Sequence, residues 1–271
     1  ALGPDGRLYI PDAGSDRIVV LSPDGKPMGQ VAPERGSPHA FSFPKDVDLD
    51  GHGRMYVADS FNNRILRMDE SGKFDLVLGG GADLDDDGYM DAGTRPGEFD
   101  EPAGVTADGE GRIYVADTNN HRLQVFHRDG SLLFAIGEEG DGLGQFRFPS
   151  DVRVGASGSV YVADRGNTRI QQFSPRGDLE AYFSLGADDS GIDRAVGDVD
   201  VGPDGEVYVP LPERNLVVRG RIGRAGGACP PRSPSRPRHP SPRSPNATRF
   251  HPTIRSASTS WSPVCATPAE R

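Results

Sequence analysis

Residues Met55 to Asp69 read MYVADSFNNRILRMD, and close copies of this stretch recur along the 271-residue chain. One tyrosine marks the register of each copy, and these tyrosines are 47, 58, 47 and 47 residues apart: Tyr9, Tyr56, Tyr114, Tyr161 and Tyr208. Aromatic and β-branched residues alternate before a short loop, and a second alternating run follows an arginine, which is the pattern of an antiparallel hairpin. The sequence therefore predicts a repeat protein built from β-strands.

The second copy, with the residues around it, shows how one unit is built. Alternating runs predict four strands, with turns that contain glycine after the first and the third: Asp46 to Asp50, Met55 to Asp59, Arg64 to Asp69 and Phe74 to Leu78. Four short strands in a repeat of this length match one propeller blade, whereas leucine-rich repeats are shorter and helical repeats would show a 3.6-residue period. We therefore expect an all-β fold, a β-propeller of four-stranded antiparallel blades.

The linked motifs of each unit also carry a resemblance to a known family. Phe-Pro-x-Asp-Val, Gly-x-Met/Val-Tyr-Val-Ala-Asp, Asn-x-Arg-Ile and a turn of the form Asp-x-x-Gly or Pro-x-Gly follow one another over Phe43 to Gly72 and again over Phe148 to Gly177. This pattern resembles the NHL repeat family, and the resemblance covers residues 1 to about 218. Because that family typically closes a ring of six blades and five second-strand motifs are visible, we expect about five of six blades, incomplete at both ends, with a truncated N-terminus.

The charge of the chain divides it into two parts. Residues 1–218 hold 20 Lys and Arg against 39 Asp and Glu, a net charge of −19, whereas residues 219–271 hold 10 Arg against one Glu, a net charge of +9. The second part is rich in Pro, Arg and Ser and contains both cysteines, Cys229 and Cys265. Such a segment buries too little apolar surface to fold, so we expect a disordered tail. It is either a basic arm or translation of a shifted reading frame, and we favour the second because the repeat pattern stops inside a blade.

The longest gap between register tyrosines contains an acidic loop. Its centre reproduces positions 1, 3, 5, 6 and 9 of the Asp-x-Asp-x-Asp-Gly calcium loop, and its candidate ligands are Asp83, Asp85, Asp87, the carbonyl of Tyr89, and Asp91. Alternating carboxylates supply the hard oxygen ligands that Ca²⁺ requires, although Thr94 stands where a bidentate Glu belongs. The alternatives are a weak calcium site and a solvated acidic turn.

A polar pattern repeats at every hairpin of the first four units. An aspartate ends the second strand and an arginine follows five residues later: Asp12 and Arg17, Asp59 and Arg64, Asp117 and Arg122, Asp164 and Arg169. Asn62, Asn120 and Asn167 lie in the loops between them. These residues would either form a polar ring around a ligand or pair across each hairpin. We prefer pairing, because a single ligand site rarely needs the same ion pair in four blades.

An enzyme hypothesis depends on the histidines. The peptidyl-α-hydroxyglycine α-amidating lyases are similar to this chain in their repeats, and the resemblance implies a zinc ion held by three His near the channel. The repeat region contains only His39, His52, His121 and His127, of which His52 lies in a turn on the opposite face and His127 within a third strand. Two usable histidines do not make a three-His zinc site, so we do not expect zinc. The charge of −19 also disfavours nucleic acid as a partner.

Together these observations favour a non-catalytic binding platform. We expect an extracytoplasmic sensor or scaffold, part of a secreted, periplasmic or extracellular protein, that binds protein, peptide or carbohydrate on its acidic loops, with possible calcium. It would be a monomeric propeller or part of a longer chain, and no apolar run is long enough to span a membrane. The alternative is a propeller lyase or lactonase that uses a channel metal.

Overall fold

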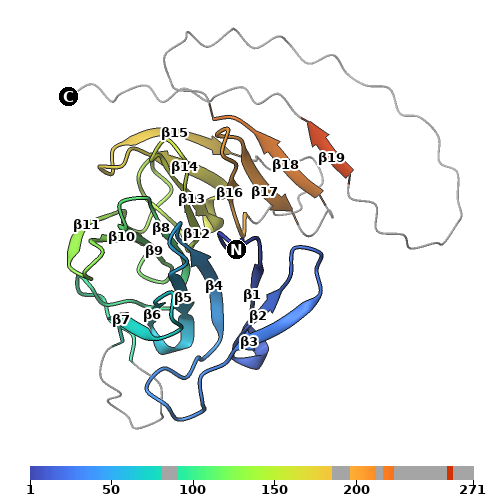
Figure 1. The fold of residues 1–271 in the computed structure, drawn as a ribbon. Coiled ribbons are helices and arrows are strands. Elements are labelled where there is room, and N and C mark those ends of the chain that lie inside the picture. Colours follow the sequence, from blue (N-terminus) through green and yellow to red (C-terminus); the bar gives the residue numbers. More distant parts are fainter. Residues whose placement is uncertain (81–90, 185–195, 212–215, 223–254, 259–271) are drawn as a thin grey trace, which may run out of the picture.

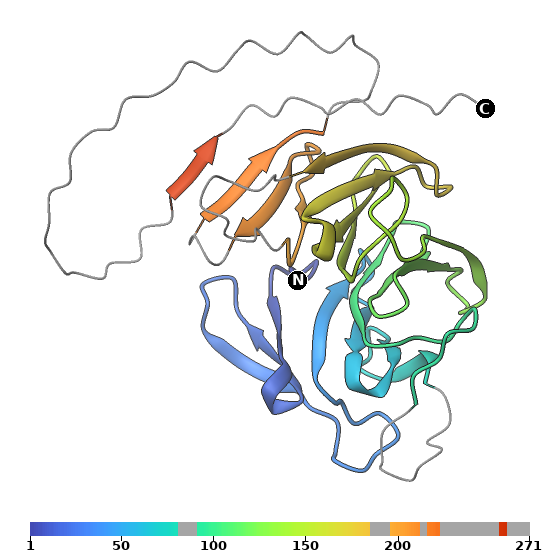
Figure 2. The same cartoon turned by 180° about the vertical axis from the view of Figure 1, so that it is seen from behind.

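A computed structural model describes residues 1–80, 91–184, 196–211, 216–222 and 255–258. The chain forms five successive small sheets around a common centre, with the strands labelled in Figure 1. Among the described residues, the helical segments are three-residue 3-10 turns, and no helix could span a membrane. The predicted all-β propeller is thus confirmed. The first and fifth sheets take neighbouring places around the ring in both this view and the reverse view of Figure 2.

Each sheet is formed by strands that are consecutive in the chain. The first contains β1 (Leu8–Asp12), β2 (Arg17–Leu21) and β3 (Pro27–Val31). The second contains β4 (Pro44–Leu49), β5 (Met55–Asp59), β6 (Arg64–Met68) and β7 (Phe74–Gly79). The third contains β8 (Pro102–Ala107), β9 (Ile113–Asp117), β10 (Arg122–Phe126) and β11 (Leu132–Ile136). The fourth contains β12 (Pro149–Val154), β13 (Val160–Asp164), β14 (Arg169–Phe173) and β15 (Leu179–Ser184), and the fifth β16 (Asp200–Val201), β17 (Val207–Leu211), β18 (Leu216–Gly220) and β19 (Arg255–Ser258).

The two end sheets differ from the three between them, which are antiparallel throughout. In the first sheet, the place of a first strand is marked only by a bridge between Leu2 and Leu8. In the fifth sheet, β19 lies parallel to β18, although residues 219–271 are predicted to be disordered. The structure therefore describes residues 219–222 and 255–258 of the tail, of which Arg219 and Gly220 end β18 and the last four form β19. The remaining tail lies outside the described residues, so its predicted disorder stays a prediction.

Hairpins between second and third strands turn through a short 3-10 segment. In the first, second and fourth sheets these segments are η1 (Ala13–Ser15), η2 (Ser60–Asn62) and η3 (Arg165–Asn167). The next residue is left-handed in each case, with φ of 52° at Asp16, 48° at Asn63 and 52° at Thr168. Left-handed backbone reverses the chain in one residue, and Asn and Asp tolerate it better than most.

The hydrophobic core lies between successive sheets. Alternation along a strand sends one set of side chains to each neighbour: Val57 packs with Ile18 of the first sheet, while Tyr56 and Ala58 pack with Val115 of the third. Val162 takes the corresponding place between the third and fourth sheets, and Val209 between the fourth and fifth. All of these side chains are buried, and each fully buried valine stabilises the fold by roughly 1.5–3 kcal/mol.

Candidate functional site

The repeated aspartate and arginine side chains form ion pairs in the first four sheets. The distances from Arg Nε to Asp Oδ2 are 2.8 Å for Arg17 and Asp12, and 2.7 Å for Arg64 and Asp59, Arg122 and Asp117, and Arg169 and Asp164. The carboxylates of the last three pairs are fully buried, whereas that of Asp12 is 33% exposed. The pairing follows from the hairpin register, because the aspartate and arginine are directly opposite each other.

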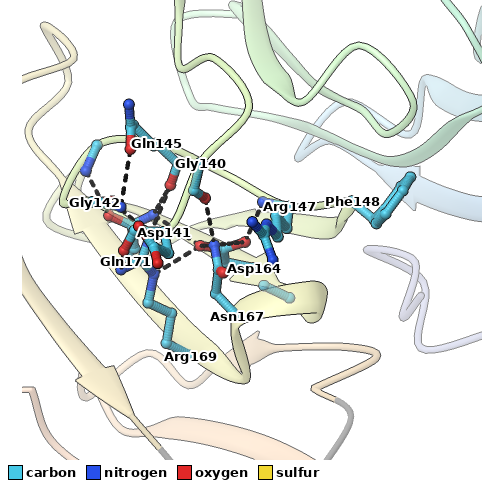
Figure 3. Close-up of polar contacts among 12 residues, drawn as sticks. Gly140, Asp141, Gly142, Gln145, Arg147, Phe148, Asp164, Asn167, Arg169 and Gln171 are labelled. Carbon is cyan, nitrogen blue, oxygen red and sulfur yellow. Dashed lines mark hydrogen bonds and ion pairs between the residues drawn. The ribbon is translucent and has the colours of Figure 1, made fainter.

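In the fourth sheet the pair is the centre of a larger network (Figure 3). Asp164 accepts hydrogen bonds from Arg169 Nε, Asn167 Nδ2, Gln171 Nε2 and the backbone N–H of Arg147. These four donors come from the hairpin turn, the third strand and the segment that leads into β12. A buried carboxylate needs this many charge-assisted partners to offset the loss of water.

The arginine of the same network holds the link between the third and fourth sheets. Its terminal nitrogens donate to the backbone carbonyls of Asp141, Gly142 and Gln145, at 2.7–2.8 Å. In the third sheet Arg122 donates to the carbonyls of Thr94, Arg95 and Glu98, and in the second sheet Arg64 donates to those of Pro38 and Ala40. The ion pairs therefore fix the links between sheets, which lie beside the hairpin turns on one face of the ring. We call this face the loop face.

Burial raises the pKa of two of the paired carboxyls, those of Asp59 and Asp117. Loss of water raises the pKa of Asp59, and the hydrogen bonds from Asn62, the N–H of Ser42 and Arg64 oppose that rise only in part. The same cause raises the pKa of Asp117, opposed by the N–H of Asp100 and by Arg122. Exposed Asp12 behaves in the opposite way: the hydrogen bond from Arg17 lowers its pKa. The carboxyls thus differ in proton affinity although they occupy one repeat position.

The first strands, which lie nearest the centre in Figure 1, carry a second polar network. Arg153 on β12 reaches over the third sheet to Asp46 on β4, with both guanidinium nitrogens 2.9–3.0 Å from the carboxylate oxygens, and also pairs with Asp151 at 2.8 Å. Asp46 accepts the N–H of Val105, and Asp151 accepts the N–H of Val199. Asp46 thus binds the first strand of the third sheet, and Asp151 binds the residue that precedes the first strand of the fifth.

A glycine replaces this aspartate in the third sheet. Gly104 stands at the same register position, and a Cβ added there would lie 2.6 Å from the Cα of Asp151 and 2.9 Å from the nitrogen of Val152. The N–H of Val152 is instead bound by the carboxylate of Asp151 itself. The glycine therefore lets the backbone of β8 approach that of β12.

A third contact repeats from sheet to sheet on the loop face. The residue that ends a hairpin turn has a left-handed backbone, and its side chain accepts a hydrogen bond from a backbone N–H. That N–H belongs to a second left-handed residue, which lies just before the first strand of the next sheet. Asp16 Oδ1 accepts from Phe43 at 2.8 Å, Asn63 Oδ1 from Glu101 at 2.8 Å, and His121 Nδ1 from Phe148 at 3.1 Å. Phe43, Glu101 and Phe148 each precede the proline that begins a first strand.

These contacts leave aromatic rings exposed on the loop face. Phe61 is 44% exposed and stacks on Phe43 with ring centres 4.6 Å apart, and Lys45 Nζ lies 5.9 Å from the centre of the Phe61 ring. Lys45 also pairs with Glu101 at 2.9 Å. Phe148 is 47% exposed, and Figure 3 shows it apart from the Asp164 network. The loop face thus combines apolar rings with charged groups at fixed positions.

The predicted calcium loop falls largely outside the described residues. Asp83, Asp85, Asp87 and Tyr89 are not described, and Asp91 begins the next described segment. Within the part of the chain that the structure describes, no three His, Cys, Asp or Glu side chains are grouped to hold a metal ion. The four histidines of the repeat region also lie in separate settings: His39 stacks on Phe74, His121 contacts Phe148, His127 pairs with Asp129, and His52 lies in the turn after Asp50.

Sequence reasoning missed several residues of these networks. Gln124 and Gln171 stand two residues after the paired arginines, and they bind both the carboxylate and the link. The inner-strand contacts of Asp46 and Asp151 were also missed, as was the role of Phe148. The repeated Asp-Val pair and the residue before each proline were the available signals.

Comparison with known proteins agrees with this architecture. The NHL repeat family model matches residues 99–126 and 146–173, which cover the first three strands of the third and fourth sheets with the ends of the links before them. The NHL repeat-containing protein 3 of Mus musculus is 32% identical over 117 residues, which are 42% of this chain and 29% of the mouse protein. This chain therefore spans less than a third of that relative.

Solved structures are similar in fold. A streptogramin B lyase superposes with a TM-score of 0.58 at 18% sequence identity, over 80% of this chain and 62% of the lyase chain. A chain of a nidogen–laminin complex gives the same TM-score and identity, over 81% of this chain and 73% of its own length. At this identity the likeness is one of fold, and it separates neither an enzyme from a binding protein nor one ligand from another.

Proposed function

Because the chain carries NHL repeats on a β-propeller fold, we propose that it is a non-catalytic binding platform whose loop face holds a protein, peptide or carbohydrate. The proposed setting is extracytoplasmic, as sensor or scaffold. The observation that carries the proposal is the use of the repeated polar side chains: Asp164, Arg169 and their counterparts bind backbone groups of the links. Such side chains hold a surface in shape, and a rigid surface loses little conformational entropy when it binds.

The exposed aromatic rings are the proposed contact points. Phe61 and Phe148 are each more than two-fifths exposed, while their neighbours Phe43 and His121 hold them by ring contacts. An aromatic ring that is already ordered offers a large contact area to a peptide side chain or to the apolar face of a sugar.

A binding screen tests this proposal. The full chain would be applied to arrays of peptides and glycans, beside the double variant Phe61→Ala/Phe148→Ala and the control Leu133→Ala. Leu133 is 46% exposed on the outer strand β11, so Leu133→Ala removes exposed apolar surface that lies outside the loop face. We expect any ligand to bind the wild type and the control alike and to bind the double variant at least tenfold more weakly, a loss of about 1.4 kcal/mol. Equal binding by all three would contradict the proposal.

We also propose that residues 83–91 bind calcium, on the sequence pattern alone. Calorimetric titration with CaCl₂ would compare the full chain with Asp85→Ala/Asp87→Ala. Saturable heat and a raised melting temperature in the wild type, both absent from the variant, are the expected results. If the wild type shows neither saturable heat nor a raised melting temperature, the segment is a solvated acidic turn.

The catalytic alternative is a propeller lyase or lactonase with a metal ion in the channel. Glyoxylate release from an α-hydroxyglycine peptide, or hydrolysis of a lactone, in the presence of added Zn²⁺ or Ca²⁺ would establish it. Turnover that also survives in Phe61→Ala/Phe148→Ala would move the functional site from the loop face to the channel.

A further inference from the structure

One histidine occupies a position where neighbouring repeats carry residues that do not change charge near neutral pH. His121, Asn63 and Asp16 all end hairpin turns in left-handed conformation, with φ of 53°, 48° and 52°. Each accepts the N–H of a left-handed residue in the next sheet. Of these three contacts, only the one made by His121 uses an imidazole nitrogen as the acceptor.

The acceptor role fixes the protonation state that the contact requires. Nδ1 of His121 must carry a lone pair to accept the N–H of Phe148 at 3.1 Å. Protonation of an imidazole, which ordinarily occurs near pH 6.5, places a hydrogen on that nitrogen, so that two donors would face each other. We propose that the His121–Phe148 contact is a pH-sensitive latch between the third and fourth sheets, closed when the imidazole is neutral and open when it is protonated.

The surroundings of the latch limit what opening can change. Phe148 is held at φ of 48°, an unfavourable conformation for a bulky residue, and the ring of His121 lies 4.6 Å from its own ring. The next residue, Pro149, begins β12, whose Asp151 and Arg153 are tied into the inner-strand network. Opening therefore releases the exposed ring of Phe148 while β12 stays in place.

Charged groups on both sides of the latch are already engaged or point to solvent. On the His121 side, Asp117 and Arg122 bind each other at 2.7 Å. On the Phe148 side, Arg147 is exposed, and the Glu138 carboxylate in the same link accepts a hydrogen bond from Gln145. Among the described residues, no hydrogen bond or ion pair joins His121 to a carboxylate.

Amide hydrogen exchange on the full chain tests the latch. Protection of the Phe148 N–H, corrected for the intrinsic pH dependence of exchange, would be compared at pH 7.5 and pH 5.0, with the Glu101 N–H as internal reference. Loss of one hydrogen bond predicts a fall of roughly tenfold at Phe148 and no change at Glu101. In His121→Asn, which copies the Asn63 contact, protection at Phe148 should be equal at the two pH values.

A second measurement on the wild type needs no variant. The ¹⁵N resonance of His121 Nδ1 and the amide resonance of Phe148 should titrate with one midpoint. A Phe148 amide that does not move with the His121 ring, or a fall in protection that persists in His121→Asn, would overturn the proposal. The latch would also make the affinity of any ligand that contacts Phe148 depend on pH; this last consequence rests on the proposed function, whereas the exchange experiment does not involve a ligand.

Discussion

Asp164 shows how a buried carboxylate is retained in this fold. Its side chain is fully buried, and so is all but 8% of the side chain of its partner Arg169. Removing both charges from water costs several kcal/mol, which close pairing and additional hydrogen bonds must offset. Asn167, Gln171 and the N–H of Arg147 supply those bonds. The ion pair therefore contributes less through the attraction between its two charges than through the link between sheets that it holds in place.

Replacement of this carboxylate should be costly. Asp164→Asn leaves the Arg169 guanidinium buried without its counter-charge, so we expect the free energy of unfolding to fall by on the order of 3 kcal/mol. Urea denaturation followed by circular dichroism would measure it. The matched control is Asp12→Asn, which breaks the equivalent pair where both side chains are a third or more exposed. We expect that variant to differ little from the wild type, because exposed pairs contribute little.

Comparable losses in the free energy of unfolding of Asp164→Asn and Asp12→Asn would contradict this account. They would mean that the ion pair itself, and not its burial, stabilises the hairpin.

At the scale of strands, Gly104 determines how the sheets meet at the centre. Asp46 and Asp151 occupy its position in the second and fourth sheets, and the glycine lets the backbone of β8 approach that of β12. A side chain there would meet backbone atoms, which cannot rotate away. The packing of the inner strands thus depends on Gly104, which departs from the repeated aspartate, as well as on the repeated residues.

Gly104→Ala should disturb this contact. A methyl group 2.6 Å from the Cα of Asp151 forces the strands apart, and we expect a loss of about 1–3 kcal/mol in the free energy of unfolding. Gly109→Ala is the control, because a Cβ at Gly109 meets no atom within 4 Å and its φ lies outside the left-handed range. Thermal melting of both variants would decide: a Gly104→Ala protein as stable as Gly109→Ala would show that β8 and β12 can separate without penalty.

The strands themselves were predictable from sequence, and their connections across the ring were not. In the second unit the predicted runs differ from β4, β5, β6 and β7 by no more than two residues at either end, because alternation and glycine turns are local signals. The pairing of Asp46 with Arg153 joins residues 107 positions apart, and no local pattern indicates it. Gln124 and Gln171 were missed because a polar residue inside a strand reads as solvent-facing until its burial is known.

At the scale of the whole molecule, each end sheet carries an exposed apolar residue on the face turned away from its packed neighbour. Ile10 occupies the register position of Val57 but is 44% exposed, whereas Val57 is fully buried. In the fifth sheet Val217 is on the face away from the fourth sheet and is 39% exposed. The described residues form five sheets, and the sixth blade expected from the family resemblance stays a prediction.

A charge placed on these faces should reveal whether they are covered in solution. Ile10→Asp should change the free energy of unfolding by no more than about 0.5 kcal/mol if the face is open to water. Val57→Asp, at the equivalent buried position, should abolish the cooperative thermal transition, because an unpaired charge would be buried between two sheets. An Ile10→Asp protein as unstable as Val57→Asp would indicate that a further sheet or a second molecule covers the first sheet.

The manner in which the arginines hold the links has a consequence for how this protein can change over generations. Arg169 and Arg122 bind main-chain carbonyl oxygens, which every amino acid possesses. Point mutations in the links can therefore alter their side chains without loss of the anchors. On the function proposed above, side chains that meet a ligand can then change through drift and selection while the arginine anchors of the scaffold are inherited intact.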